Sequence, residues 1–223
     1  LCMILSRGRN FVFIHIPKTG GTALALALEA RAMASDEMLG DTPKALKRRR
    51  RLQGIETHGR LWKHSTLADI EGLASREALR QMFTFTLVRN PFDRAVSLYH
   101  WLKEQRFDHP MVSLARETPF TTFITDPLMR QSLKAHQAPS YMRQSDGVEH
   151  CSLYIRLEQF ASDAQPLFDH LGFAFDLPRI NESQRDRDWR VYYDSPAISA
   201  VQDSCSTELD RFEYSFNELP LSL

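Results

Sequence analysis

Residues 11–22, which read FVFIHIPKTGGT, decide the fold that this sequence predicts. Their first half, 11–16, is an apolar run rich in β-branched and aromatic residues, which is typical of a strand buried on both faces of a parallel sheet. A polar loop that contains two glycines follows it over 17–22. The Ala- and Leu-rich segment 22–33 comes next, and its residues favour a helix. Strand, glycine loop and helix in this order predict the first half of a βαβ unit.

A second unit of the same kind begins with the run 83–88, FTFTLV, which predicts another strand. Asn90 and Pro91 follow it and are typical of a helix N-cap and a first helical turn. The apolar face of this helix has helical spacing and consists of Phe92, Ala95, Val96, Tyr99 and Leu102. The opposite, polar face carries Asp93, Ser97 and His100.

Further strands and helices complete the pattern. A third strand is expected over 152–157. Helices are expected over 67–82, 118–126, 160–171 and 195–209. The alternation of strands and helices predicts an α/β fold with a mainly parallel central sheet flanked by helices, in a single domain over 1–223. Ligands of such sheets bind outside the carboxyl ends of the strands, where both loops lie.

The composition excludes several classes of protein. The 223 residues contain 28 Lys and Arg and 28 Asp and Glu, so the formal net charge is zero. A broad nucleic-acid binder needs net or clustered positive charge, so no nucleic-acid partner is expected. No apolar run approaches the roughly 18 residues that a membrane span requires. The sequence predicts no particular oligomeric state.

The cysteines and the first residues point to a reducing compartment. Cys2, Cys151 and Cys205 are too few and too far apart for a disulfide scaffold or a four-ligand zinc site. We interpret them as free thiols. The first residues do not resemble a signal peptide, because Arg7 and Arg9 are followed at once by the run 11–16. These features predict a cytoplasmic protein.

Residues 44–51, KALKRRRR, form a run with six positive charges. Its first interpretation is a solvated helix face or a mobile loop. Its second is a contact for an anionic partner or substrate. The sequence leaves both open.

The chemistry-bearing residues lie in the two strand-to-helix loops. Glycines in 17–22 let backbone N–H groups point into a concave space, and Lys18, Thr19 and Thr22 add a charge and hydroxyl groups. This combination suits a phosphate or a sulfate group. It is not a Walker loop, because its lysine precedes the glycines. Arg89 and Ser97 supply a second set of anion ligands.

Two anion sites at one sheet edge suit a nucleotide with phosphates at both its 5′ and 3′ ends. The segments HIPKTGGT (15–22) and VRNPFDRAVSLYHW (88–101) resemble the 5′-phosphosulfate and 3′-phosphate signatures of sulfotransferases that use 3′-phosphoadenosine-5′-phosphosulfate (PAPS). They are most similar to the carbohydrate branch, which includes heparan 2-O-sulfotransferases and bacterial members. Weaker similarity extends over KHST (63–66), YIRLE (154–158), NESQR (181–185), YYD (192–194) and DRFEY (210–214).

The resemblance implies a P-loop-like nucleotide-binding sulfotransferase fold and a set of site residues. The 5′-phosphosulfate would be held by Lys18, Thr19, Gly20, Gly21 and Thr22. The 3′-phosphate would be held by Arg89 and Ser97, and the nucleotide would be bordered by Ser183 and Arg185. His64 matches the catalytic histidine of the 2-O-sulfotransferase branch, with His58 as the rival base.

The expected reaction is an in-line displacement at sulfur. A neutral histidine accepts the proton of the acceptor hydroxyl, and Lys18 stabilises the departing phosphate oxygen. The donor is PAPS, the acceptor is a carbohydrate or another hydroxyl-bearing molecule, and no metal is expected.

Two alternatives stay open at this point. A small-molecule kinase of the P-loop type would bind ATP and magnesium, and would place an Asp at a strand end as metal ligand. A non-catalytic nucleotide-binding or interaction module would bind PAPS without turnover. Fold resemblance alone does not separate these alternatives from a sulfotransferase.

Overall fold

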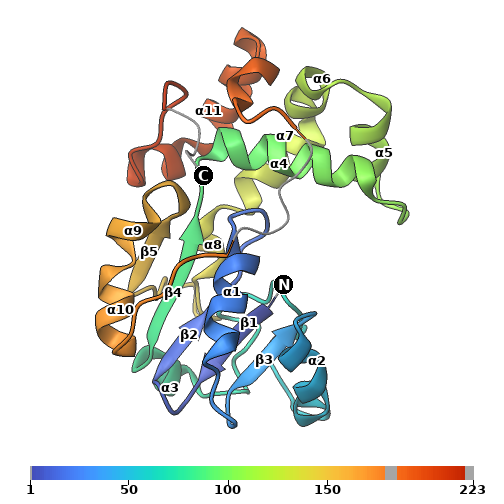
Figure 1. Cartoon of the computed structure of the whole chain (residues 1–223). Helices are drawn as coiled ribbons and strands as arrows, with labels where there is room; N and C mark the ends of the chain where they lie inside the picture. The colour runs from blue at the N-terminus through green and yellow to red at the C-terminus, as the bar shows by residue number, and fades with distance from the viewer. Residues whose placement is uncertain (1, 179–184, 219–223) are drawn as a thin grey trace. The chain divides into compact units, whose positions relative to one another are not determined.

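The computed structural model describes residues 2–178 and 185–218. The chain divides into two compact units, which Figure 1 shows as ribbons. Unit 1 comprises Leu1–Val88 and Ala138–Ile180, and unit 2 comprises Arg89–Gln137 and Asn181–Leu223. The expectation of a single domain over 1–223 stays a prediction.

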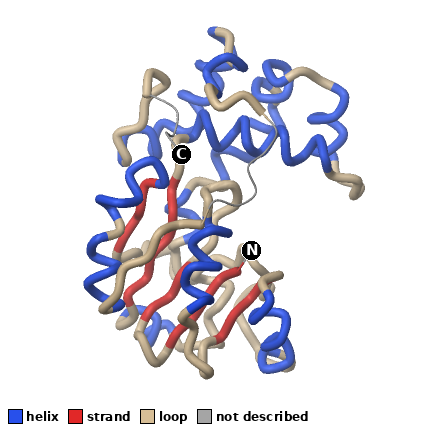
Figure 2. The backbone as a smooth tube through the Cα atoms, in the orientation of Figure 1, coloured by secondary structure: helices blue, strands red, loops and turns tan. Residues whose placement is uncertain are grey.

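Unit 1 contains a five-stranded sheet (Figure 2). Its strands are β1 (Cys2–Ser6), β2 (Phe11–Phe13), β3 (Glu37–Gly40), β4 (Phe83–Val88) and β5 (Leu153–Arg156), in the order β3-β1-β2-β4-β5. β4 is parallel to β2 on one side and to β5 on the other. β1 is antiparallel to both β2 and β3. The sheet is therefore mixed.

The prediction of a mainly parallel sheet is wrong for a local reason. The sequence analysis did not include β1 or β3. A four-residue turn, 7–10, joins β1 directly to β2, and a connection this short can only pair strands antiparallel. Asn10 ends the turn at φ 53°, and its N–H donates to the Arg7 carbonyl at 3.3 Å. Asparagine is among the few residue types that adopt this left-handed conformation readily.

The predicted strands 83–88 and 152–157 are confirmed as β4 and β5. The predicted strand 11–16 is regular only over β2. Its continuation stays paired, because the Ile14 N–H donates to the Phe85 carbonyl at 3.1 Å and the Thr86 hydroxyl donates to the Ile14 carbonyl at 2.7 Å. This pairing carries the chain straight from the sheet into the glycine loop.

The helices of unit 1 are short apart from the first. They are α1 (Gly21–Ala30), α2 (Pro43–Arg48), α3 (Arg76–Arg80), α8 (Ala138–Tyr141), α9 (Phe160–Asp163) and α10 (Gln165–Leu171), with 3-10 turns η1 (Arg49–Leu52) and η2 (Leu157–Gln159). The prediction of a helix at 22–33 is confirmed by α1, and 160–171 is helical as the pair α9 and α10. α1 runs along one face of the sheet (Figure 1).

The predicted helix 67–82 is wrong over its first half, since only α3 forms. Thr66 and Asp69 exchange side-chain hydrogen bonds with each other's backbone N–H groups, at 2.7 and 3.1 Å. Such local bonds compete with helical ones. Gly72 then adopts φ 113°, which a helix cannot contain. The turn chemistry of 66–72 therefore overrides its helical propensity.

The core of unit 1 lies between α1 and the sheet. Phe13 and Phe85 stack with their ring centroids 5.5 Å apart, and Phe11 lies 5.7 Å from Phe85. Leu24 and Leu28 of α1 pack in the same buried cluster. This core anchors the strand and the helix that flank the glycine loop.

Unit 2 is helical in its described residues. Its elements are α4 (Pro91–Glu104), α5 (Pro110–Glu117), α6 (Phe120–Thr125), α7 (Pro127–Ala135), η3 (Trp189–Tyr192) and α11 (Ser195–Arg211). The predictions over 118–126 and 195–209 are confirmed by α6 and α11, while α5 and α7 were not predicted. The Asn90 side chain caps α4 by accepting from the Phe92 N–H at 3.1 Å, as predicted. No helix among the described residues has the length and apolar character to cross a membrane.

The apolar face predicted for α4 is buried and forms the core of unit 2. Phe92 stacks on Trp189, with ring centroids 5.8 Å apart and an angle of 8° between the planes. Two residues of the predicted polar face are buried as well, because Asp93 is 3% exposed and Ser97 is 6% exposed, while His100 is half-buried. A helix buried on its polar side needs partners for those polar groups.

We expect Phe85→Ala to lower the free energy of unfolding by about 3–5 kcal/mol, because the Phe85 side chain is fully buried and contacts other phenylalanines of the sheet. Urea unfolding followed by circular dichroism measures the change. Phe107→Ala is the matched control, because Phe107 is 50% exposed, and it should change the stability by less than about 0.5 kcal/mol. Equal losses in the two variants would contradict this account of the core.

Candidate active site

The loop between β2 and α1 has the form of an anion site. Lys18 and Gly20 both adopt left-handed conformations, at φ 65° and 84°. Gly20 is the N-cap of α1 and no side chain caps this helix. The first N–H groups of a helix have no partner within the helix, and they carry its positive partial charge. The positive end of α1 and Lys18 therefore lie in one short loop.

Two close contacts fix the shape of this loop. The Thr19 hydroxyl donates to the Ile16 carbonyl at 2.9 Å, and Thr19 is buried. A Cβ atom at Gly21 would lie 2.3 Å from Cδ2 of His15, so no larger residue fits there. The Thr19 hydroxyl, which the sequence analysis expected to contact the anion, binds within the loop in this structure. The backbone N–H groups are then the main ligands that the loop offers.

His64 packs at the base of the loop and is held in one tautomer. Its Nδ1 lies 2.8 Å from the backbone carbonyl oxygen of His15. Because a carbonyl oxygen only accepts hydrogen bonds, Nδ1 must carry the proton in the neutral ring. Nε2 then keeps its lone pair, which is the form that a general base requires. The rings of His15 and Trp62 make edge contacts with the His64 ring, at centroid distances of 4.8 and 5.1 Å.

Burial keeps both histidines neutral. It lowers the pKa of His64 from 6.5 to about 4, against the opposing effect of the His15 hydrogen bond, and the nearby Lys63 lowers this pKa further. Burial also lowers the pKa of His15 well below its usual range, and the neighbouring His64 adds to this effect. A base with a low pKa is fully unprotonated at neutral pH.

The residues around His64 differ in their exposure. Lys63 forms an ion pair with Asp41 at 2.9 Å, and the hydrogen bond from Lys63 lowers the pKa of Asp41. His58, the rival base, is exposed, and its backbone N–H donates to the Glu71 carbonyl at 2.8 Å. The contacts described for His58 do not join it to the loop or to His64.

In unit 2, Arg89 and Arg185 share one buried carboxylate. Nε and Nη2 of Arg89 donate to Oδ2 of Asp93 at 2.9 and 2.7 Å. Nη2 of Arg185 donates to Oδ1 of Asp93 at 2.5 Å. We call these three residues the Arg89–Asp93–Arg185 cluster. Its two positive charges and one negative charge leave a net charge of +1, and Ser97 lies one helical turn beyond Asp93 on α4.

The structure groups the predicted site residues into two sets. Unit 1 holds residues 18–22 together with His64, and unit 2 holds Arg89, Ser97 and Arg185. Ser183 lies outside the described residues. Among the described residues, no group of three or more His, Cys, Asp or Glu side chains could hold a metal ion.

The sequence analysis missed two parts of the site. The first is the role of Asp93, which was placed on the polar face of the predicted helix without a partner. Its ion pair with Arg89, which stands four residues earlier and just before the helix N-cap, was not predicted. The contact of His64 with His15 joins residues 49 positions apart, and no local pattern announces it.

A glycine loop at a helix N-terminus, a neutral histidine beside it, and two half-buried arginines that share a buried carboxylate are features of an enzyme that acts on anionic ligands. The sequence pattern of the Sulfotransferase family matches residues 3–213. The chain therefore belongs to the sulfotransferase family, whose members transfer sulfuryl groups. Searches of curated proteins and of solved structures found no match.

We expect acid to destabilise the fold through His64. Its pKa is about 4 in the folded chain against an ordinary value of 6.5, so the unfolded chain takes up the proton first as the pH falls. The stability that depends on neutral His64 is complete above about pH 6.5. It is lost as the pH falls toward 4, by about 3 kcal/mol in full.

Urea unfolding between about pH 7 and pH 4.5 measures this loss. His64→Asn should reduce it, while His58→Asn, at an exposed histidine, should keep the wild-type pH dependence. A wild-type pH dependence in His64→Asn would contradict the burial of a neutral ring.

Proposed function

We propose that this protein transfers the sulfuryl group of PAPS to a hydroxyl group of a carbohydrate acceptor, with His64 as the general base. The observation that carries the proposal is the hydrogen bond between His64 Nδ1 and the His15 carbonyl at 2.8 Å. It holds a neutral base against the backbone of His15, which precedes the loop 17–22 by two residues in the sequence. Membership of the sulfotransferase family supports sulfuryl transfer in general.

The loop 17–22 fits the 5′-phosphosulfate end of the donor. The uncapped N-terminus of α1 offers backbone N–H groups, and Lys18 adds a full positive charge. Gly20 and Gly21 keep side chains away from the backbone, so an anion can approach it closely. The loop ligands in this proposal are Lys18, Thr19, Gly20, Gly21 and Thr22.

The 3′-phosphate is assigned to Arg89 and Ser97, with Arg185 and Ser183 bordering the nucleotide. Asp93 holds the guanidinium groups of Arg89 and Arg185 in place, and this reduces the ordering that a phosphate would have to impose. Because the cluster has a net charge of +1, it attracts an anion even with Asp93 ionised. An arginine fork matches phosphate geometry bidentately.

The chemical step follows from the tautomer of His64. Its Nε2 accepts the proton of the acceptor hydroxyl while the acceptor oxygen forms a bond to sulfur. The bond from sulfur to the bridging oxygen of the donor breaks on the opposite side, and the 5′-phosphate leaves with the electron pair. Lys18 and the loop N–H groups stabilise the negative charge that develops there. This step balances without a metal ion, since Lys18 supplies the positive charge.

The similarity of residues 15–22 and 88–101 to the carbohydrate branch supports a sugar as acceptor. The same similarity supports grouping this chain with the 2-O-sulfotransferase-like and bacterial members of that branch. The position of His64 in this branch agrees with its buried, neutral state here.

We expect 3′-phosphoadenosine-5′-phosphate to bind far better than AMP, because each charge-assisted hydrogen bond to the 3′-phosphate contributes roughly 1.5–3 kcal/mol. Arg89→Ala should remove most of this preference and weaken AMP binding little. Calorimetric titration without magnesium measures both affinities. Arg106→Ala, at an exposed arginine of the same unit, is the control and should keep the preference. Equal binding of both nucleotides, or a preference for ATP with magnesium, would overturn the sulfotransferase proposal.

We expect Lys18→Ala to reduce turnover by roughly 10²–10³-fold, as for the loss of a transition-state donor. A screen of labelled PAPS against glycans and small hydroxyl compounds supplies the acceptor for this assay.

We expect His64→Ala to reduce turnover in the same assay by about 10²–10⁴-fold, as for the loss of a general base. His64→Ala should keep nucleotide affinity, and His58→Ala should keep turnover. If His58→Ala loses turnover and His64→Ala does not, His58 is the base.

A further inference from the structure

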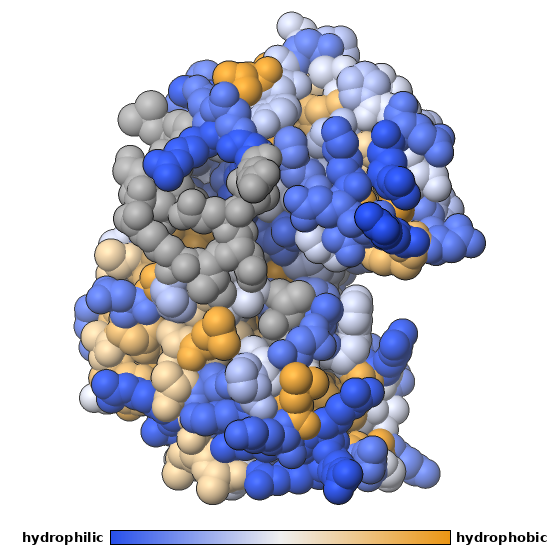
Figure 3. Space-filling view, turned by 45° about the vertical axis from the view of Figure 1, so that its right-hand side comes forward, coloured by the Kyte–Doolittle hydropathy of each residue, from blue (hydrophilic) through white to orange (hydrophobic). Residues whose placement is uncertain are grey.

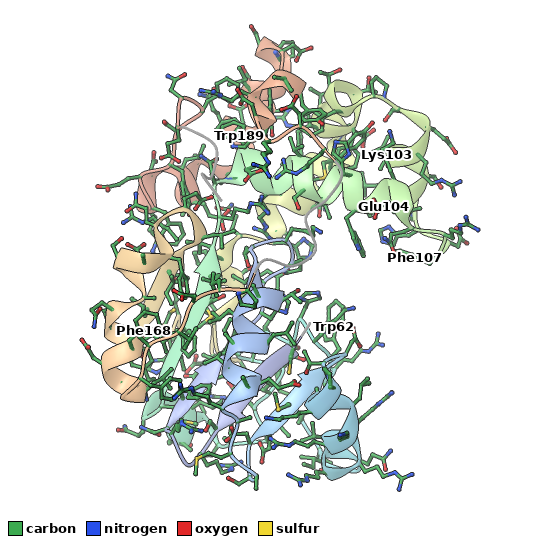
Figure 4. The ribbon with its side chains drawn as sticks, viewed as in Figure 1. Trp62, Lys103, Glu104, Phe107, Phe168 and Trp189 are labelled. Carbon is green, nitrogen blue, oxygen red and sulfur yellow. The ribbon has the colours of Figure 1, made fainter. Side chains whose placement is uncertain are left out.

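Unit 1 contains a cavity of about 430 Å³ beside the proposed base. Its wall is formed by residues of β3, of α2 and η1, and of the segment 60–63. The lining residues are Met38, Leu39, Gly40, Asp41, Ala45, Leu46, Arg49, Leu52, Gln53, Arg60, Leu61, Trp62 and Lys63. Two of them, Trp62 and Lys63, immediately precede His64. Figure 4 shows Trp62 on the side of unit 1 that also carries α2 and β3.

The lining has a positive charge. Arg49, Arg60 and Lys63 face a single acidic residue, Asp41. Lys63 is paired with Asp41 at 2.9 Å, so these two charges balance. Arg49 and Arg60 are exposed and form no ion pair with a described residue. The cavity therefore offers two guanidinium groups that a ligand can pair with.

The basic run 44–51 divides into two sets by its contacts. Lys44 donates to the Glu29 carbonyl at 2.5 Å, Arg48 donates to that of Asp36 at 3.1 Å, and Arg51 donates to that of Ala34 at 2.6 Å. These three residues attach α2 and η1 to the last turn of α1 and to the segment that follows it.

The other set consists of Lys47, Arg49 and Arg50, which are exposed. Of the six positive residues in the run, only Arg49 belongs to the cavity lining. Both interpretations of the run stay open, because Lys47 and Arg50 are exposed outside the lining while Arg49 belongs to it. Hydrophilic residues cover much of the lower part of the face in Figure 3, with apolar ones among them.

Apart from Gln53, the rest of the lining is apolar or aromatic. Among the lining residues, Met38, Leu39 and Ala45 are buried, while Trp62 is 43% exposed. A partly exposed indole in a lining that also holds guanidinium groups suits a ring that is apolar on its faces and charged at its rim. A pyranose ring that carries a carboxylate or a sulfate has this character.

We propose that this cavity binds the acceptor, and that the acceptor is an anionic saccharide whose charged group contacts Arg49 and Arg60 while a ring packs on Trp62. The proposal rests on the proposed function, because it takes the ligand beside His64 to be the acceptor. It assigns the specificity for a charged sugar to residues outside both phosphate loops.

Direct binding tests the proposal without turnover. The probes are tetragalacturonate, which carries carboxylates, a chondroitin sulfate tetrasaccharide, which also carries sulfates, and the methyl ester of tetragalacturonate, which is neutral. Calorimetric titration of the wild type should show at least one acidic probe binding ten times or more tightly than the neutral one. Raising the salt concentration should weaken that acidic probe and leave the neutral one unchanged.

Matched variants locate the contact. Arg49→Gln and Arg60→Gln should each weaken the acidic probe about tenfold, as for one charge-assisted contact. Lys47→Gln and Arg50→Gln remove the same charge from the same segment outside the lining, and should weaken it less than twofold. Trp62→Ala should weaken acidic and neutral probes alike. All five variants should keep the wild-type affinity for 3′-phosphoadenosine-5′-phosphate.

The proposal is overturned if neither acidic probe binds better than the neutral ester, or if Lys47→Gln and Arg50→Gln weaken binding as much as Arg49→Gln. Failure of the proposed function gives a different result. In that case the wild type does not prefer 3′-phosphoadenosine-5′-phosphate over AMP, whatever the saccharides do.

Discussion

The hydrogen bond from His64 Nδ1 to the His15 carbonyl is the contact on which the site in unit 1 depends. It joins the segment 62–66 to the residues that directly follow β2. The His15 ring itself packs so close to α1 that residue 21 must be glycine. The same contact fixes the tautomer of His64, so its Nε2 is the basic atom. Strand end, helix start and base are thus positioned by one buried pair of rings.

In unit 2, ion pairs rather than ring packing hold the proposed ligands in place. Two arginines next to each other repel, and burying them without a counter-charge would be costly. Asp93 meets both requirements, because its two oxygens accept from Arg89 and Arg185 separately. The three side chains of the cluster sum to a charge of +1, in line with the phosphate that the proposed function assigns to Arg89. Placing the carboxylate on α4, one turn before Ser97, puts the hydroxyl on the same side of the helix.

Local sequence patterns predicted the elements that form because of the residues within them. The run 83–88 is a strand because its side chains are apolar or β-branched, and Asn90 caps α4 as its type predicts. The sheet order was not predictable in this way, because the turn 7–10 lacks the Asn-Gly or Asp-Gly signal of a hairpin. The glycine loop was readable from residues 17–22. The contact of His64 with His15 was not, since it depends on the packing of distant segments.

The net charge of the chain says less about its ability to bind anions than the local distribution of its charges does. Equal numbers of acidic and basic residues exclude a broad positive field, but they do not exclude small positive sites. Asp93 is shared by two arginines, and Asp41 balances Lys63 alone, which leaves Arg49 and Arg60 to the cavity. A protein that binds small anions needs only such local excess, because each contact acts over a few ångströms. A chain with zero net charge can therefore hold several local anion sites. Its net charge does not repel an anionic substrate at long range.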